Sequence, residues 1–340
     1  MAAVDEPGHL EEAFINELRA ARASGRRLPD FFVVGHAKCG TTAMCEMLGA
    51  HPQVFLPRFK ETQFLSRAPH HRTDMPRRRE TLRPQTLDAY LSLFESAGPE
   101  QRAGEGSTEY IRTPAAAPHI AELCPEARIV AAFREPASFL RSLHLQLLEV
   151  GVETESDFAK ALGLEERRSR GKSIPRHCAW PPALLYSQHV HYAEQLRQYH
   201  ELFGSERVLV LIYDDFRADN EGTVRQVLRF LGLDASPPVE ALEANPTVRV
   251  RSHRAGELIG AISTGRGPAS RATRTLVKSL TSERLRRGAL SAVGRLVVDK
   301  DPRPPDDAFM EGLRRSLHSE VVALSDYLGR DLVSLWGYGG

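Results

Sequence analysis

The sequence predicts an α/β fold in three layers, with a central parallel sheet flanked by helices. Short apolar runs that suit buried strands alternate along the chain with longer amphipathic stretches that suit helices. The strand-like runs are apolar throughout, which is typical of strands covered on both faces. Strands that alternate with helices in this way favour a parallel sheet.

The individual elements follow from the apolar pattern and from the residues that interrupt it. The first strand lies between Pro29 and Gly35, and His51-Pro52 ends the helix that comes after it. We expect strands at 31–34, 53–56, 127–133 and 207–213, helices at 41–50, 86–98, 136–149, 184–204 and 219–232, and a final helix in the tail.

The domain organisation is expected to be simple. Residues 1–28 read as a polar leader with one short amphipathic helix, and residues 29–340 as a single domain. Within that domain, 245–305 is basic and helical in pattern with no strand, and 306–340 is a C-terminal helix and tail. We expect the basic residues mostly on a solvated helix surface, with an anionic ligand as the alternative.

Composition narrows the possible partners. The 45 Lys and Arg residues nearly balance the 44 Asp and Glu, and a net charge of +1 gives no overall attraction to nucleic acid or an anionic membrane. The four cysteines lack the spacing of a zinc site, so we expect reduced thiols and no metal. No secretory segment and no apolar run of about 18 residues is present. We therefore expect a cytoplasmic protein, and the Arg- and Ala-rich sequence suggests a bacterial source.

The segment "GHAKCGTT" (35–42) leaves a predicted strand and enters a predicted helix, which is where backbone N–H groups bind phosphate well. An ordinary P-loop reads G-x-x-x-x-G-K-[ST], but here Thr41 stands in the lysine position and Lys38 lies inside the loop. The strand at 127–133 is followed by Arg134, where a P-loop kinase would place an acid for Mg²⁺. This pattern indicates that side chains, and not a metal, neutralise the bound anion.

The loop resembles the 5′-phosphosulfate loop of sulfotransferases that use 3′-phosphoadenosine 5′-phosphosulfate (PAPS), of the heparan sulfate type and its soluble bacterial relatives. That loop reads K-x-G-T-[TR]-x-L, and this chain has Lys38 to Met44 with Met for Leu. The family's 3′-phosphate segment is a strand, R-x-P, and a serine eight residues after the arginine. Here Arg134, Pro136 and Ser142 have that spacing.

Two weaker matches and one gap complete the resemblance, which spans residues 30 to 336. "KETQFLS" (60–66) is similar to the family's E-x-[HQ]-F-F, with Glu61 and Gln63 in place. "GEGSTEYI" (104–111) is similar to G-E-[KA]-[ST]-P-x-Y, but Gly106 and Thr108 depart from it. The basic K-G-R loop of the heparan type is missing. The nearest basic stretch offers Arg249, Arg251 or Arg254 in its place.

The resemblance implies a P-loop-like fold and a PAPS-dependent enzyme that releases 3′-phosphoadenosine 5′-phosphate (PAP). It implies that Glu61 is the general base and that Lys38 stabilises the leaving phosphate. The 5′-phosphate would be held by the loop and the 3′-phosphate by the arginine and serine. The expected binding residues are Lys38, Cys39, Gly40, Thr41, Thr42, Arg134, Ser142, Arg249 and Arg251, and the expected acceptor residues are Lys60, Gln63, His144, Arg176 and Trp180, with His177 and Tyr186 as further lining candidates.

Several alternatives stay open at this point. His144 is a rival for the base, because histidine has that role in the small-molecule sulfotransferases. A P-loop kinase that uses ATP and Mg²⁺ and a non-catalytic nucleotide-binding protein are the rival functions. The acceptor is expected to be a small-molecule or glycosidic hydroxyl, less favourably an amine, and a secondary metabolite is expected. The sequence does not indicate the oligomeric state.

Overall fold

The computed structural model describes residues 7–66, 83–176, 178, 180–238, 249–250, 298–299 and 305–339. The chain divides into two units. The first consists of Met1–Glu135, His189–Asn245 and Ser319–Gly340, and the second of Pro136–Gln188 and Pro246–His318.

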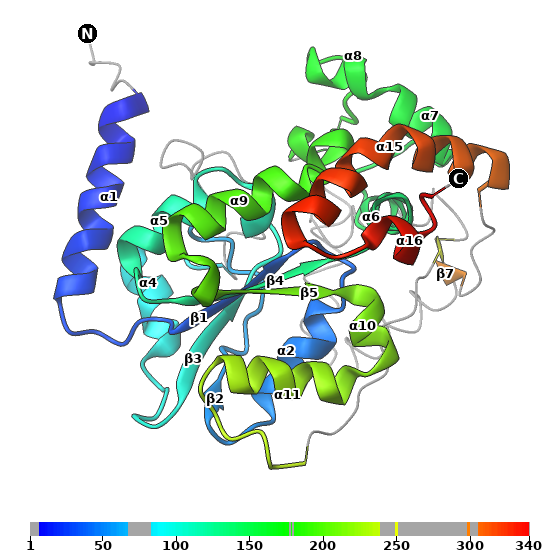
Figure 1. The fold of residues 1–340 in the computed structure, drawn as a ribbon. Coiled ribbons are helices and arrows are strands. Elements are labelled where there is room, and N and C mark those ends of the chain that lie inside the picture. The colour runs from blue at the N-terminus through cyan, green and yellow to red at the C-terminus, as the bar shows by residue number, and fades with distance from the viewer. Residues whose placement is uncertain are drawn as a thin grey trace, which may run out of the picture. The chain divides into compact units, whose positions relative to one another are not determined.

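The first unit contains a five-stranded parallel sheet (Figure 1). Its strands are β1 (Phe31–Gly35), β2 (Val54–Phe55), β3 (Arg102–Gly106), β4 (Arg128–Phe133) and β5 (Val208–Ile212), and their order in the sheet is β2-β3-β1-β4-β5. All four pairings are parallel. The predicted α/β fold with a central parallel sheet is confirmed.

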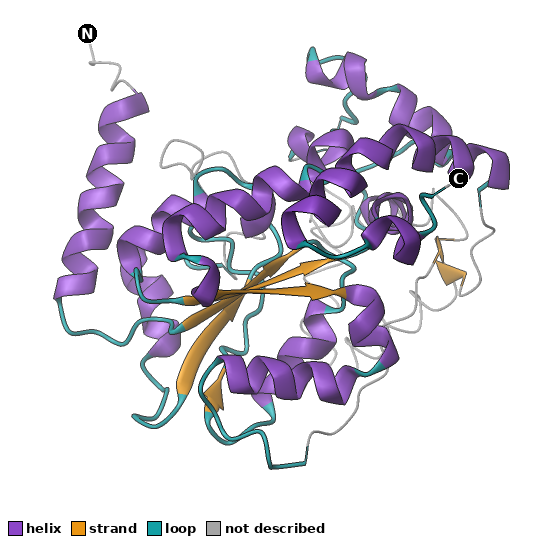
Figure 2. Ribbon diagram, in the orientation of Figure 1, coloured by secondary structure: helices purple, strands orange, loops and turns teal. Residues whose placement is uncertain are grey.

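Helices cover both faces of this sheet (Figure 2). Alternate strand residues, among them Phe31, Val33 and Val130, join the hydrophobic core under α2 (Thr41–Gly49) and α11 (Asn220–Phe230). The opposite face carries α9 (Tyr192–Phe203), with the Phe133 ring 5.0 Å from that of Tyr192, and α9 in turn packs on α5 (Ala116–Leu123). The two apolar faces explain why the strands read as continuous apolar runs.

The remaining elements of the first unit lie around this core. They are α1 (Pro7–Ala23), which packs on α5 and buries Phe14 and Leu18, α4 (Leu87–Leu91), η2 (Ser92–Phe94), η3 (Tyr110–Arg112), η6 (Ser205–Arg207), α10 (Tyr213–Ala218) and α16 (Leu332–Trp336). Two elements extend across the boundaries between the units: η5 (Ser187–His189) and α15 (Asp307–Leu328).

The second unit is built on α6 (Pro136–Glu149), whose bounds are those expected from the sequence. It also holds α7 (Phe158–Gly163), α8 (Glu165–Ser169) and η4 (Pro181–Leu184). The ring of Phe158 lies edge-on to Phe309, with 5.7 Å between the centroids. The stretch between α6 and η4 is therefore partly helical.

Three expectations about the elements are wrong. The helix expected at 184–204 is present only from Tyr192, and the one expected at 86–98 is reduced to α4 and η2. The segment 245–305 was expected to contain no strand, yet β6 (Arg249–Val250) pairs antiparallel with β7 (Val298–Asp299). β6 and β7 have two residues each, which is too few for a periodic pattern. The rest of that segment lies outside the described residues.

One central strand, β3, was not expected at all. Its sequence, RAGEG, has two glycines and no β-branched residue, which is a weak strand signal. Gly104 is required here for packing, because a Cβ on it would lie 2.1 Å from Cζ of Phe31 on the neighbouring strand. Tertiary packing therefore selects a residue that local propensity disfavours.

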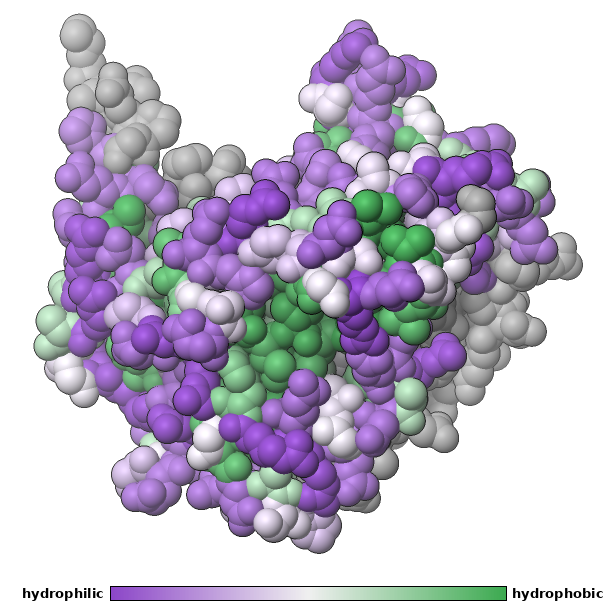
Figure 3. All heavy atoms as spheres, viewed as in Figure 1, coloured by the Kyte–Doolittle hydropathy of each residue, from purple (hydrophilic) through white to green (hydrophobic). Residues whose placement is uncertain are grey.

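Hydrophilic residues cover most of the face visible in Figure 3, with apolar residues showing between the helices. Among the described residues, the large hydrophobic side chains that are exposed are Val150, Leu202 and Leu335. None of the helices in the described part of the chain has the length and apolarity needed to cross a membrane.

Candidate active site

The loop between β1 and α2 depends on two glycines. Gly35 has φ 142°, and a Cβ on it would lie 2.6 Å from the backbone N of Ala132. Gly40, the N-cap of α2, has φ 78°, and a Cβ there would lie 2.7 Å from the ring of Phe216. Only glycine fits these positions without strain. Among the described residues no side chain caps α2, so the N–H groups of its first turn can bind an anion.

The two predicted cations of the donor site lie at this loop. Lys38 adopts a left-handed backbone conformation with φ 69°, which is uncommon for a non-glycine residue. Arg134, directly after β4, donates from Nη1 to the carbonyl O of Lys38 at 3.2 Å. Its guanidinium also lies 4.8 Å from the ring centroid of Tyr213. The parallel pairing of β1 with β4 brings the ends of the two strands together and so explains this proximity.

Lys60 connects the loop to the predicted base. Its Nζ lies 3.3 Å from Thr41 Oγ1 and 3.1 Å from Thr42 Oγ1, at the start of α2. The same Nζ is 3.6 Å from Oε1 of Glu61. The structure therefore places one ammonium group between the candidate phosphate loop and the candidate carboxylate.

The turn that carries Glu61 has an unusual backbone. Four non-glycine residues in the described part of the chain have positive φ, and three of them are predicted site residues: Lys38 (69°), Glu61 (64°) and Gln63 (52°). Such conformations are unfavourable for L-residues and tend to occur at functional sites. The backbone N–H of Glu61 donates to the carbonyl of Gly106 at 2.9 Å, which ties the turn to the end of β3.

The carboxylate of Glu61 is held by Thr108. The backbone N–H of Thr108 donates to Oε2 at 2.9 Å, and its Oγ1 lies 3.2 and 3.1 Å from the two carboxylate oxygens. Thr108 is the position where the sequence departs from the proline of the resembling motif, and proline has no N–H to donate. The sequence alone does not reveal this role, because Thr108 and Glu61 lie 47 residues apart.

Gly106, the second departure from that motif, makes room for Lys60. A Cβ at this position would lie 2.9 Å from Sγ of Cys45 and 3.1 Å from Cε of Lys60. A longer side chain at 106 would displace the lysine. Nearby, Oε1 of Gln63 accepts a hydrogen bond from Nη1 of Arg83, so this predicted acceptor residue has a side-chain partner.

The two cysteine thiols near the loop have raised pKa values. Burial raises the pKa of Cys39 to about 12 and that of Cys45 to about 11. Both remain protonated at neutral pH, because a thiol ionises near its pKa. Cys39 can therefore contribute its backbone to the loop, but not a thiolate.

Several predicted residues belong to the second unit. Ser142 is buried in α6, and its Oγ has no hydrogen-bond partner among the described residues. The same is true of Oε1 of Gln146, one turn further along α6, and of Nε1 of Trp180. Arg176 is exposed. Unsatisfied buried polar groups are uncommon in native proteins, so each of the three is a candidate ligand contact.

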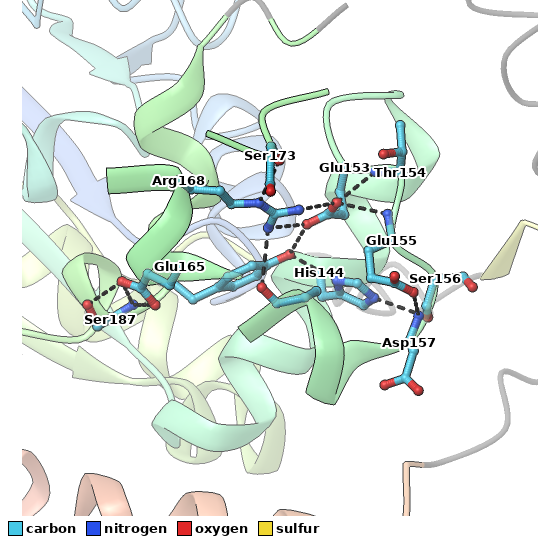
Figure 4. Close-up of polar contacts among 12 residues, drawn as sticks. His144, Glu153, Thr154, Glu155, Ser156, Asp157, Glu165, Arg168, Ser173 and Ser187 are labelled. Carbon is cyan, nitrogen blue, oxygen red and sulfur yellow. Dashed lines mark hydrogen bonds and ion pairs between the residues drawn. The ribbon is translucent and has the colours of Figure 1, made fainter. Parts of the chain in front are cut away.

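His144 lies in a buried polar network of the second unit (Figure 4). Its Nδ1 is 2.9 Å from Oη of Tyr186, and its Nε2 is 3.4 Å from the carbonyl O of Ser156. Tyr186 donates to Glu153, which forms a two-pronged ion pair with Arg168 at 2.7 and 2.8 Å. Burial lowers the pKa of His144. Both ring nitrogens thus have partners inside this network.

Some predicted positions lie beyond what the structure describes. Arg251, Arg254 and His177 are outside the described residues, and Arg249 is described only through its backbone in β6. Over the described ranges, no group of three or more His, Cys, Asp or Glu side chains is placed to hold a metal ion.

The chain is similar in sequence to two kinds of curated sulfotransferase. Carbohydrate sulfotransferase 15 of Rattus norvegicus is 26% identical over 271 residues, covering 66% of this chain and 46% of the relative. Bifunctional heparan sulfate N-deacetylase/N-sulfotransferase 3 of Homo sapiens is 25% identical over 217 residues, covering 61% of this chain and 22% of the relative. The chain thus spans less than half the length of these curated relatives.

The fold is shared with a solved structure. The crystal structure of a sulfotransferase from Alicyclobacillus acidocaldarius matches with a TM-score of 0.63 and 24% identity, and covers 92% of this chain and 99% of the other. Residues 29–237 match the model of the sulfotransferase family. Since that match covers more than half of the chain, the protein belongs to the sulfotransferase family.

Proposed function

We propose that the protein transfers the sulfuryl group of PAPS to a hydroxyl of a small-molecule or glycosidic acceptor. One observation carries the proposal beyond family membership: Lys60 lies between the threonines of the β1–α2 loop and the carboxylate of Glu61. A donor held at the loop and an acceptor held at Glu61 would both face this ammonium. Transfer of this kind needs positioning and charge stabilisation more than covalent help from the protein.

The residues present fit PAPS. The uncapped start of α2 and the two required glycines suit the 5′-phosphate, and Lys38 supplies the charge that stabilises the leaving phosphate. Arg134 offers a planar fork for the 3′-phosphate. The resembling motif pairs this arginine with a serine eight residues later, so we propose Ser142, whose Oγ has no hydrogen-bond partner among the described residues, as a second contact of that phosphate. PAPS supplies the sulfuryl group and leaves as PAP.

Glu61 is the proposed general base. It would accept the proton of the acceptor hydroxyl, a contribution worth about 10²–10⁴-fold in rate. Thr108 fixes its carboxylate through the N–H bond of 2.9 Å. His144 is the weaker choice, because Tyr186 and Ser156 occupy both of its ring nitrogens.

The acceptor, the source of the protein and its cellular location are proposed on less direct support. The names of the curated relatives refer to carbohydrates and heparan sulfate, which favours a glycosidic acceptor. One of these names includes N-sulfotransferase, so an amine acceptor is kept as the alternative. We propose Gln63, Arg176 and Trp180 as acceptor contacts. A bacterial source, a cytoplasmic location and a place in secondary metabolism are proposed from the sequence composition alone.

Calorimetry tests the donor, and labelled PAPS tests the reaction. PAP should bind more tightly than ADP with Mg²⁺, and sulfate transfer to an acceptor from a metabolite or glycan panel should continue in excess EDTA. Lys38→Ala and Glu61→Gln should each abolish turnover, with PAP still binding to Glu61→Gln. Preference for ADP with Mg²⁺ would support a kinase instead, and wild-type turnover in Glu61→Gln would remove Glu61 from the role.

A further inference from the structure

Glu105, near the end of β3, is a buried carboxylate surrounded by hydroxyl groups. Its exposure is 1%. Oε1 accepts from Thr62 Oγ1 at 2.6 Å and from Ser107 Oγ at 2.5 Å, and Oε2 accepts from the hydroxyls of Tyr90 at 2.6 Å and Tyr110 at 2.9 Å. In the described part of the chain, all four of its hydrogen-bond partners are therefore hydroxyls.

Three of these hydroxyls also bind the backbone of the turn that follows Glu61. Ser107 Oγ accepts from the N–H of Gln63 at 3.1 Å, Thr62 Oγ1 from that of Phe64 at 3.2 Å, and the Tyr110 hydroxyl from that of Leu65 at 3.2 Å. A hydroxyl has one proton to donate and lone pairs with which to accept. Because each proton goes to Glu105, the oxygen lone pairs are directed to three consecutive backbone N–H groups.

This arrangement supports a backbone that would otherwise be unfavourable. Glu61 and Gln63 both have positive φ, at 64° and 52°. Phe64 and Leu65, directly after them, are buried, and the Phe64 ring stacks on Tyr90 at 4.8 Å. The Glu105 carboxylate therefore fixes the segment Thr62–Leu65. This segment contains Gln63, the predicted acceptor contact, and directly follows Glu61, the predicted base.

We propose that Glu105 is a positioning residue for the acceptor side of the reaction, acting through Thr62, Ser107 and Tyr110 to set the direction of Glu61 and Gln63. The inference rests on the proposed function, because it assigns that direction a role in transfer. None of the hydrogen bonds made by Glu105 reaches the β1–α2 loop. Loss of the Glu105 network should therefore affect the base and the acceptor and leave donor binding in place.

The matched variants are Tyr110→Phe and Tyr90→Phe. Both remove a buried tyrosine hydroxyl that donates to Oε2 of Glu105, but only the Tyr110 hydroxyl also accepts from Leu65 N–H. We expect amide exchange at Leu65 to be about tenfold faster in Tyr110→Phe than in Tyr90→Phe, and kcat to be about tenfold lower. The Kd for PAP should change less than twofold in both. Hydrogen exchange with residue resolution, steady-state kinetics and calorimetry supply the three measurements.

A third variant, Glu105→Gln, keeps the shape and removes the charge. It should speed exchange at Gln63, Phe64 and Leu65 together and lower kcat at constant PAP affinity. Equal exchange and kcat in the two tyrosine variants, or a parallel loss of kcat and PAP affinity, would overturn the inference, since a purely structural role predicts those results. If the wild-type protein neither binds PAP nor transfers sulfate, the proposed function fails, and the exchange data alone decide whether Glu105 holds the segment.

Discussion

Replacing Thr108 with proline should slow sulfate transfer about 5- to 30-fold without weakening donor binding. The change removes the N–H that donates to Glu61 Oε2 at 2.9 Å and the Oγ1 that contacts both carboxylate oxygens. A hydrogen bond to a charged group contributes about 1.5–3 kcal/mol, which we reduce to about 1–2 kcal/mol because the Glu61 side chain is 29% exposed. At about 1.4 kcal/mol for each factor of ten, this gives the stated range.

The control for this prediction is Thr108→Ala, which keeps the N–H and loses only the Oγ1 contacts. It should slow transfer about two- to threefold. Single-turnover reactions with labelled PAPS measure the rate of transfer, and calorimetry with PAP measures donor affinity. The reasoning is refuted if the two variants have the same rate, because the N–H would then contribute nothing. It is also refuted if PAP affinity falls as much as the rate, because the substitution would then act on the loop.

Three further predictions address the loop and its surroundings. Lys60→Ala should lower kcat about tenfold and Lys60→Arg should restore part of it, as measured by steady-state kinetics; wild-type kcat in Lys60→Ala would contradict the bridging role. Arg134→Ala and Ser142→Ala should weaken PAP about 10- to 100-fold and about 2- to 10-fold, while adenosine 5′-phosphate, which lacks the 3′-phosphate, should bind within threefold of wild type in calorimetry. Burial lowers the pKa of His36 from 6.5 to about 3, so between these pH values the unfolded state binds a proton that the folded state does not. The free energy of unfolding therefore falls as the pH drops from 6.5 toward 3. His36→Gln should remove up to about 1.4 kcal/mol per pH unit of that loss in urea unfolding at pH 7 and pH 4.5; an unchanged difference would show that His36 is not the group responsible.

The sequence predicts those strands that lie within a run of mostly apolar residues. β1 and β4 lie inside the sheet and β5 lies at its edge, and the apolar runs of these three strands were sufficient to predict them. β3 is also buried, but Gly104 is needed there because of the ring of Phe31 on the neighbouring strand. That requirement exists only after the two strands pair, so no local pattern reveals it.

The residues of the candidate site likewise divide into those whose positions the sequence pattern predicts and those whose positions it does not. Lys38 and Arg134 were found because a strand followed by a loop and a helix places them at predictable ends of strands. The partners of Glu61 could not be found, because Thr108 is 47 residues away in sequence and acts partly through its backbone N–H. The four hydroxyls around Glu105 come from three segments: Thr62, Tyr90, and Ser107 with Tyr110. The short motif at 104–111 contains only the last two, so the network as a whole could not be predicted. The network of His144 likewise depends on Tyr186, which lies 42 residues further along the chain.

Lys60 and Glu61 are adjacent residues, and the Lys60 ammonium lies 3.1 Å from Thr42 Oγ1 at the start of α2 and 3.6 Å from Oε1 of Glu61. In the proposed mechanism, charge stabilisation by Lys60 and proton acceptance by Glu61 therefore depend on the position of one turn. An acceptor that pushes this turn away from the sheet withdraws both groups at once, whereas an acceptor that fits beneath it engages both. Substrate selection in this enzyme would then operate as an all-or-none fit at a single turn, and attempts to broaden its acceptor range should begin with the side chains that line that turn and leave the turn itself intact.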